Sequence, residues 1–272
     1  MMEILHYTFM QNALIAGILV SLAAGIIGSL IVVNRLVFLT GGVAHSSYGG
    51  IGLAIYFGLP IFLGASLFTV ATALLLAWLT FKKRHLSDTY IGLIWAVGMA
   101  IGVIFVDMTP GYNVDLMSYL FGSILAVERS DLWFMGGLLA VVLLVVHRWY
   151  REFLAISYDS DYAALRGIPT GRFYTLLLIL SALTVVVAIK VVGLILVIAL
   201  MTIPTHIASH RSATLYGMMM RSALLAASFT LLGLWISYRY DLTSGACIIL
   251  VAAAGLVLES LWRSLRRPKS PA

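Results

Sequence analysis

The sequence has few charged residues and a single cysteine. Charged residues make up 10% of its 272 residues, hydrophobic residues make up 62%, and the mean hydropathy is +1.04. These values exclude an ordinary soluble domain and are typical of a polytopic membrane protein. The one cysteine, Cys247, permits no internal disulfide. We therefore expect residues 1–272 to form one all-α transmembrane domain.

The sequence also lacks the motifs of three common membrane-protein activities. It has no Gly-x-x-x-x-Gly-Lys-(Ser/Thr) motif for ATP binding and no His-Glu-x-x-His motif of a zinc protease. Its eleven acidic residues fall in loops or near the ends of apolar segments, whereas a proton- or sodium-coupled transporter normally needs a carboxylate within the membrane. We therefore expect no P-loop ATPase, zinc protease or ion-coupled transporter, and no permanently bound cofactor.

Apolar segments close to the length that crosses a bilayer, about 17–25 residues, recur along the chain. They predict a transmembrane helical bundle of eight or nine spans. The predicted spans are Met10–Val33, Val43–Gly58, Ile61–Phe81, Thr89–Val106, Leu132–His147, Phe173–Ile189, Gly193–Ser209, Ser222–Ser237 and Gly245–Trp262.

The placement of lysine and arginine predicts the orientation of the chain. With nine spans and the N-terminus outside, fourteen of the seventeen basic residues fall in inner loops or in the basic tail at residues 263–272. Cytoplasmic loops of membrane proteins carry such an excess. We therefore expect the N-terminus outside and the C-terminus inside. The net charge of +6 then reflects topology and contact with membrane lipid, and we expect no nucleic-acid partner.

One apolar segment is too short to cross the membrane. Leu116–Val127 has twelve residues, which span about 18 Å as a helix, against a hydrocarbon core about 30 Å thick. If it crossed, the basic loop that follows would move outside. We therefore predict a re-entrant half-helix that enters from the outer face. The alternative is an amphipathic helix that lies on the surface.

The longest polar interruption, Arg148–Arg172, predicts a short helix on the inner face, within a segment at about residues 151–170. Asp159 can cap the helix N-terminus, and Asp161 falls in the first turn, where a carboxylate complements the helix dipole. Gly167 and Pro169 then end the helix. Such a helix could be held by a cytoplasmic partner. The alternative is a plain surface linker.

His45 stands in the apolar, glycine-rich segment Leu39–Ala54. An ionisable residue is costly to hold in lipid, so it indicates a functional site. Ser46, Ser47 and Tyr48 could supply hydroxyl groups beside it along a substrate pathway. The alternative is a histidine that only packs against its neighbours.

A second histidine candidate lies near the inner boundary. His206 and His210 are four residues apart, so both can face one side of a helix, and Pro204 loosens the backbone just before them. Such a pair could hold a metal ion at two points. We take His206 as the stronger candidate for a metal ligand. Both residues could instead be solvated at the boundary.

Four stretches of the chain resemble, in order, the permease subunits of ATP-binding-cassette importers for zinc, manganese and iron. The stretches are the His45 region, Asn113–Val127, Ser157–Pro169 and Val191–Ala208. The third of them, Ser157–Pro169, is similar to the family's coupling segment, Phe-Asp-x-x-x-Ala-x-x-x-Gly-(Ile/Leu)-Pro. The Asp, Ala and Gly of that pattern match Asp159, Ala163 and Gly167 here.

The resemblance implies a non-catalytic permease of a bacterial inner membrane that transports a divalent metal (zinc, iron or manganese). It also implies three kinds of partner. These are cytoplasmic ATPase subunits docked on the coupling segment, an extracytoplasmic metal-binding protein that delivers the cargo, and a second permease, either a second copy or a related chain.

The chain departs from the family at Gly41, four residues before His45, where the family usually has an aspartate. Manganese prefers carboxylate ligands, whereas zinc and iron accept imidazole nitrogen. We therefore expect zinc or iron rather than manganese. A first alternative is a permease for a metal chelate or siderophore-derived iron. A second, from another class, is a non-transporting scaffold or an enzyme that uses His45.

Overall fold

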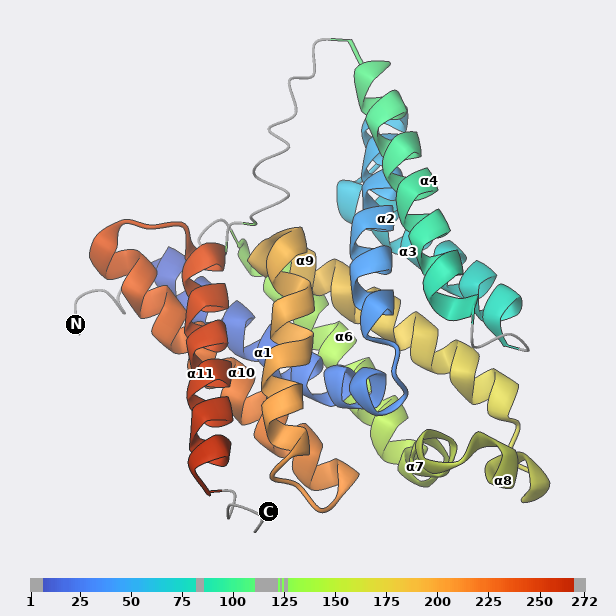
Figure 1. Cartoon of the computed structure of the whole chain (residues 1–272). Helices are drawn as coiled ribbons and strands as arrows, with labels where there is room; N and C mark the ends of the chain where they lie inside the picture. The colour runs from blue at the N-terminus through green and yellow to red at the C-terminus, as the bar shows by residue number, and fades with distance from the viewer. Residues whose placement is uncertain (1–6, 82–85, 111–121, 123, 125–126, 267–272) are drawn as a thin grey trace.

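The computed structural model describes residues 7–81, 86–110, 122, 124 and 127–266, and the regular elements of this part are α-helices, as expected (Figure 1). The elements are α1 (Thr8–Val33), α2 (Val37–Phe57), α3 (Ile61–Thr80), α4 (Ser87–Asp107), α6 (Arg129–Arg148), α7 (Tyr150–Tyr158), α8 (Ser160–Leu165), α9 (Thr170–Ser209), α10 (Leu215–Tyr240) and α11 (Ser244–Arg266).

Seven helical segments of the described chain are long and apolar enough to cross a membrane. They are α1, α3, α4, α6, the first half of α9, α10 and α11. Two further predicted spans correspond to α2 and to the second half of α9. The first of these is not among the seven, and the second is a shorter apolar helix, Leu196–Ser209. A count of eight or nine spans therefore remains a prediction.

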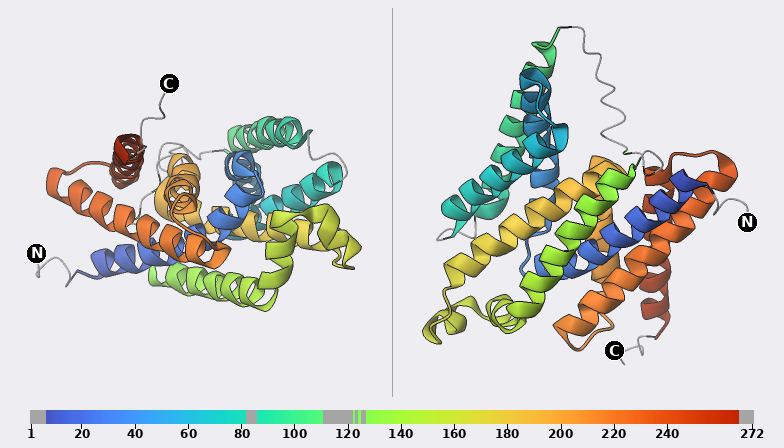
Figure 2. Two further views of the ribbon diagram at one scale, coloured as in Figure 1. Left: turned by 60° about the horizontal axis from the view of Figure 1, so that its bottom comes forward. Right: turned by 180° about the vertical axis from the view of Figure 1, so that it is seen from behind.

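The helices form two packed groups that share α9. In one group, α1 lies between α6 and α10 and is the most buried of the seven spans (Figure 2). In the other, α2 packs along α4 and also contacts α3 and α9 (Figure 1). Because α9 contacts α1, α2, α3, α10 and α11, it joins the two groups into one bundle.

Helix α9 combines two predicted spans in one element with a break at Gly193. This residue has φ 78° and ψ 168°, outside the helical region. Residues with a Cβ rarely adopt such a positive φ, and glycine adopts it at little cost. The break allows the two halves of α9 to run in different directions (Figure 1). The predicted boundary between Phe173–Ile189 and Gly193–Ser209 lies at this break.

The predicted capped helix on the polar connection is present as α8. The Asp159 side chain accepts hydrogen bonds from the backbone N–H groups of Asp161 (3.0 Å) and Tyr162 (2.9 Å). Gly167 follows the helix with φ 80°, the left-handed conformation expected of a helix stop. Within α8, Ala163 is buried.

The connection also contains α7, which the sequence analysis did not predict. This helix is amphipathic, and its apolar Phe153 and Ile156 are buried beneath it. Its nine residues are too few to give a strong periodic signal, so packing rather than local propensity decides its structure. The predicted half-helix, Leu116–Val127, lies largely outside the described residues.

Candidate functional site

His45 lies on α2, where its ring stacks against Trp95 of α4. The ring centroids are 4.2 Å apart and the planes differ by 8°. The indole N–H of Trp95 is engaged elsewhere, because it donates to the Met99 sulfur at 3.0 Å. The Nδ1 atom of His45 is buried and has no hydrogen-bond partner in the described part of the chain. The ring is thus held in one plane, and its Nδ1 atom makes no hydrogen bond to the described residues.

Close contact between α2 and α4 places the two rings together. A Cβ added at Gly102 would lie 2.4 Å from the carbonyl oxygen of Tyr48, and one added at Gly98 would lie 2.7 Å from the Ser46 Cα. A Cβ at Gly52 would in turn lie 2.4 Å from the Gly102 carbonyl oxygen. Small residues at this spacing let membrane helices approach backbone to backbone. We refer to Gly52, Gly98 and Gly102 as the glycine seam.

The hydroxyl groups next to His45 have different environments. Ser46 and Ser47 donate to the carbonyl oxygens of Val43 (3.0 Å) and Ala44 (2.6 Å) on their own helix. Their oxygen atoms can still accept a hydrogen bond or contact a cation. The Tyr48 hydroxyl is buried and, among the described residues, has no partner. Of the three predicted pathway residues, Tyr48 therefore has the least satisfied polar group.

Gly41 faces the second half of α9 rather than open space. A Cβ added there would lie 3.0 Å from Cδ1 of Ile198, tighter than an ordinary contact. An aspartate at this position would share a helix face with His45, but Ile198 would have to move slightly to admit it. The departure from the family pattern is therefore accompanied by close apolar packing.

His206 and His210 share one side of α9, as their spacing predicts. Their ring centroids are 4.6 Å apart, and Nδ1 of His210 donates to the carbonyl oxygen of His206 at 2.8 Å. Both side chains are exposed. Among the described residues, no group of three or more His, Cys, Asp or Glu side chains could hold a metal ion. The described residues therefore do not gather three such side chains around either His45 or His206.

An ion pair near this end of α9 was not predicted. Arg211 donates to Glu259 of α11 through two nitrogen atoms, and the Nε bond measures 3.1 Å. The Glu259 side chain is 8% exposed. The two residues are 48 positions apart, so no local sequence pattern could have revealed this contact.

Sequence reasoning also missed Trp95 and the α4 side of the glycine seam. For Trp95 the sequence carries no specific signal, because a tryptophan in an apolar helix most often packs against other apolar groups or faces lipid. For the glycines a signal was present, because Gly98 and Gly102 form a Gly-x-x-x-Gly motif typical of close helix pairs.

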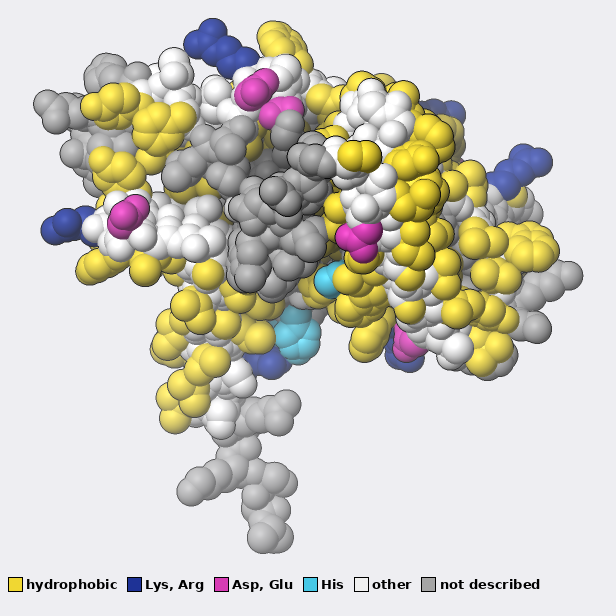
Figure 3. Space-filling model, turned by 90° about the horizontal axis from the view of Figure 1, so that it is seen from above, with side chains coloured by type: hydrophobic (Ala, Val, Ile, Leu, Met, Phe, Trp, Pro, Cys, Tyr) yellow, Lys and Arg dark blue, Asp and Glu magenta, His cyan; other side chains and the backbone are white. Residues whose placement is uncertain are grey.

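On the face seen from above, hydrophobic side chains are abundant and charged side chains are few (Figure 3). Seen from above, histidine side chains are visible between the side that carries α11 and the side that carries α2 to α4 (Figure 3). A mostly apolar surface is expected where helices face lipid.

Comparison with known proteins gives a consistent result over nearly the whole chain. Residues 6–263 match the family model described as the ABC 3 transport family. An uncharacterized membrane protein of Synechocystis sp. PCC 6803 is 48% identical over 263 residues, which are 97% of this chain and 94% of that protein. The manganese transport system membrane protein MntC of Halalkalibacterium halodurans is 33% identical, with 92% and 86% covered.

A solved structure agrees with these relatives. The chain is similar to one in the structure of PsaBC from Streptococcus pneumoniae in complex with Fab, with a TM-score of 0.85 and 30% identity over 95% of this chain and 93% of that one. The chain therefore belongs to the ABC 3 transport family, the permease family of metal importers indicated by the four sequence motifs, and is a multi-pass, non-catalytic membrane subunit.

Proposed function

We propose that this chain forms the translocation pathway of an ATP-driven importer of divalent metal ions, with His45 as a ligand on that pathway. The observation that carries the proposal is the stacked, half-buried imidazole of His45, whose Nδ1 has no protein partner among the described residues. A relative named for manganese transport, MntC, supports a metal as cargo.

One imidazole is a poor metal site, so the pathway needs further ligands. A second permease, either another copy or a related chain, would supply a second histidine if His45 lies at the interface between the two. Ser46, Ser47 and Tyr48 would line the same route. His206, exposed near the inner end of α9, would contact the cargo at a later and separate point.

The cargo is proposed to be zinc or iron(II) in preference to manganese. The side chains around His45 supply imidazole nitrogen and hydroxyl groups, and position 41 adds no carboxylate. Zinc and iron accept imidazole, whereas manganese favours carboxylate and water. The name of a relative points to manganese instead, and a competition between the metals distinguishes the two.

Transport is proposed to be powered through α8. Asp159 caps this helix, Asp161 complements its dipole, and Gly167 ends it, so a rigid element projects from the polar connection between α6 and α9. A cytoplasmic ATPase subunit bound to α8 would move this helix when it binds ATP. That movement would switch the pathway between outward-facing and inward-facing states. An extracytoplasmic binding protein would deliver the metal, and the chain would lie with its N-terminus outside and its C-terminus inside the bacterial inner membrane.

The test is uptake into proteoliposomes that contain the permease, its ATPase and its binding protein, with zinc, iron(II) and manganese in competition. We expect ATP-dependent uptake of zinc or iron(II), and no uptake with a non-hydrolysable ATP analogue. Preferred uptake of manganese would refute the metal preference. If only a chelated metal moves, the cargo is a chelate and the proposal of a free ion fails.

A further inference from the structure

A groove on the face of α1 that lies between α6 and α10 is not used by the proposed transport mechanism. Its volume is about 790 Å³. In the view from behind, α1 runs between α6 and α10 (Figure 2), and it contacts both helices. The lining residues come from these three helices and from the start of α7; they are Ile26, Leu143, Val146, His147, Arg148, Tyr150, Arg151, Glu152, Tyr216, Met219 and Met220.

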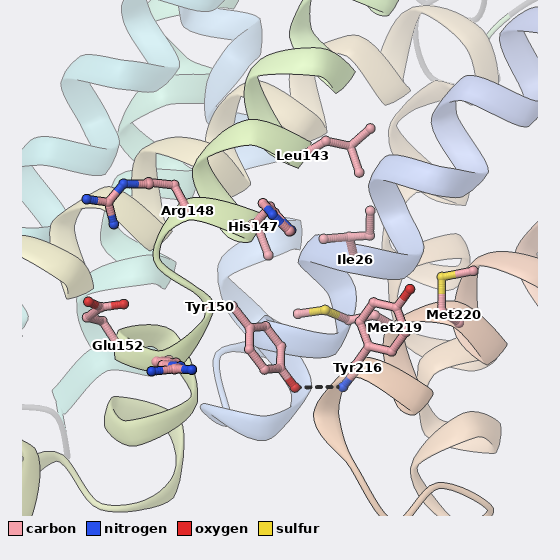
Figure 4. A pocket seen from close by; sticks show the side chains of 11 residues that line it. Ile26, Leu143, His147, Arg148, Tyr150, Glu152, Tyr216, Met219 and Met220 are labelled. Atoms are coloured by element: carbon pink, nitrogen blue, oxygen red, sulfur yellow. Dashed lines mark hydrogen bonds between the residues drawn. The ribbon is translucent and has the colours of Figure 1, made fainter.

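The groove is charged at one end and mostly apolar at the other, where the Tyr216 side chain lies beside Met219 (Figure 4). Arg148 and Glu152 lie at one end, while Ile26, Met219 and Met220 lie at the other (Figure 4). Arg151 adds a second cation near Glu152 in the sequence and also lines the groove. The charged end therefore carries two guanidinium groups and one carboxylate, so its net charge is positive.

Aromatic residues indicate that the charged end lies at the level of the lipid head groups. Trp149 directly follows α6. The Arg148 guanidinium carbon lies 5.8 Å from the centroid of the Trp149 ring. The Tyr150 hydroxyl accepts a hydrogen bond from the backbone N–H of Tyr216 at 3.0 Å (Figure 4). Tryptophan and tyrosine are enriched where a membrane protein meets the head-group region.

The apolar end lies deeper in the membrane. Leu143 precedes Arg148 by five residues on α6, which places it about 7 Å further along the helix axis. Leu143 and Met220 are both partly exposed along the groove. An apolar channel that opens into a basic, aromatic rim at head-group level has the form of a site for one lipid molecule.

We propose that this groove binds a phospholipid with an anionic head group, such as phosphatidylglycerol. The phosphate would lie against Arg148 and Arg151, and an acyl chain would lie along Leu143, Ile26 and Met220. The bound lipid would bridge α6, α7 and α10, and α7 leads directly into α8. The site would thus link lipid composition to the segment that couples to the ATPase.

The charge test uses the purified full-length chain in detergent, with phosphatidylglycerol or phosphatidylcholine added and retained lipid measured by native mass spectrometry. The variant Arg148→Gln/Arg151→Gln removes the two cations. The matched control, Arg172→Gln/Arg221→Gln, removes two other arginines that lie outside this groove. We expect the groove variant to retain phosphatidylglycerol at least about tenfold less than wild type.

The shape test keeps every charge. Leu143→Trp narrows the apolar end, whereas Leu144→Trp places the same ring on a neighbouring exposed residue of α6 that does not line the groove. We expect phosphatidylglycerol retention to fall in the first variant and to remain in the second.

Three results would overturn the proposal. They are equal retention of phosphatidylcholine by the wild type, equal losses in the groove and control arginine variants, and unchanged retention in Leu143→Trp. The first two would show general membrane attraction, and the third would show that no acyl chain enters the groove. None of these measurements needs metal or an ATPase, so they are independent of the proposed transport function.

Discussion

Helices α2 and α6 are packed in opposite ways. On α2, glycines bring the backbone of α4 so close that an added Cβ would meet backbone atoms. On α6, Gly136 and Gly137 face open space, with no atom within 4 Å of an added Cβ. Yet α6 is among the seven helices that are apolar enough to span a membrane, and α2 is not.

The difference shows that a strongly apolar helix in this protein need not be a buried one. Helices that face lipid must be apolar all along one side. A helix surrounded by other helices can carry His45, two serines and a tyrosine, because its polar groups are kept from lipid. The less apolar helix is therefore the one that carries the candidate pathway.

The largest expected effect comes from adding one methyl group to the glycine seam. Gly102→Ala would place Cβ 2.4 Å from the Tyr48 carbonyl oxygen, so α2 and α4 must separate, at a cost of about 1–3 kcal/mol. Gly137→Ala on α6 meets nothing and should leave stability unchanged or slightly higher. Thermal unfolding in detergent measures both. Equal stability of the two variants would contradict the description of the seam.

A second comparison uses two tryptophans. Trp95 stacks on His45, whereas Trp133 on α6 is 84% exposed. Trp95→Leu should lower ATP-driven metal uptake several-fold because the imidazole is no longer held in one plane, and Trp95→Phe should retain most uptake because an aromatic face remains. Trp133→Leu should have no effect on uptake. If Trp95→Leu transports like wild type, the stacking has no role in positioning His45.

A third prediction separates coupling from the pathway. Asp159→Ala removes the acceptor for two N–H groups of α8, which destabilises a helix by about 1 kcal/mol, and uptake should fall while metal binding remains. Asp159→Ser keeps a capping oxygen and should restore most of the uptake. If serine is as damaging as alanine, the carboxylate acts by direct contact with a partner rather than as a cap.

The smallest expected effect is a change of metal preference. Gly41→Asp adds a carboxylate one helical turn before His45, so the ratio of manganese to zinc uptake should rise a few-fold. Gly41→Ala controls for the contact with Ile198, since its Cβ meets the same Cδ1 atom at 3.0 Å. An equal change of the ratio in both variants would mean that packing, not the carboxylate, sets the preference.

Local signals predicted much of this molecule. Apolar length located most of the long helices, and the capping chemistry of Asp159 and Gly167 predicted both ends of α8 to within two residues. The contact of His45 with Trp95 could not be predicted, because it joins residues 50 positions apart through the pairing of two helices. The pair of exposed Arg211 with buried Glu259 has the same origin. The site therefore depends on helix pairing, which the sequence indicated through the glycines around His45 and through Gly98 and Gly102.

The most direct test of the central claim is ATP-driven metal uptake by His45→Ala beside His210→Ala. The second variant removes an exposed imidazole that donates to the backbone carbonyl of His206 and that the proposed function does not name as a ligand. We predict that uptake is lost in His45→Ala, with the ATPase still bound, and that it remains in His210→Ala. Wild-type uptake by His45→Ala would contradict the account.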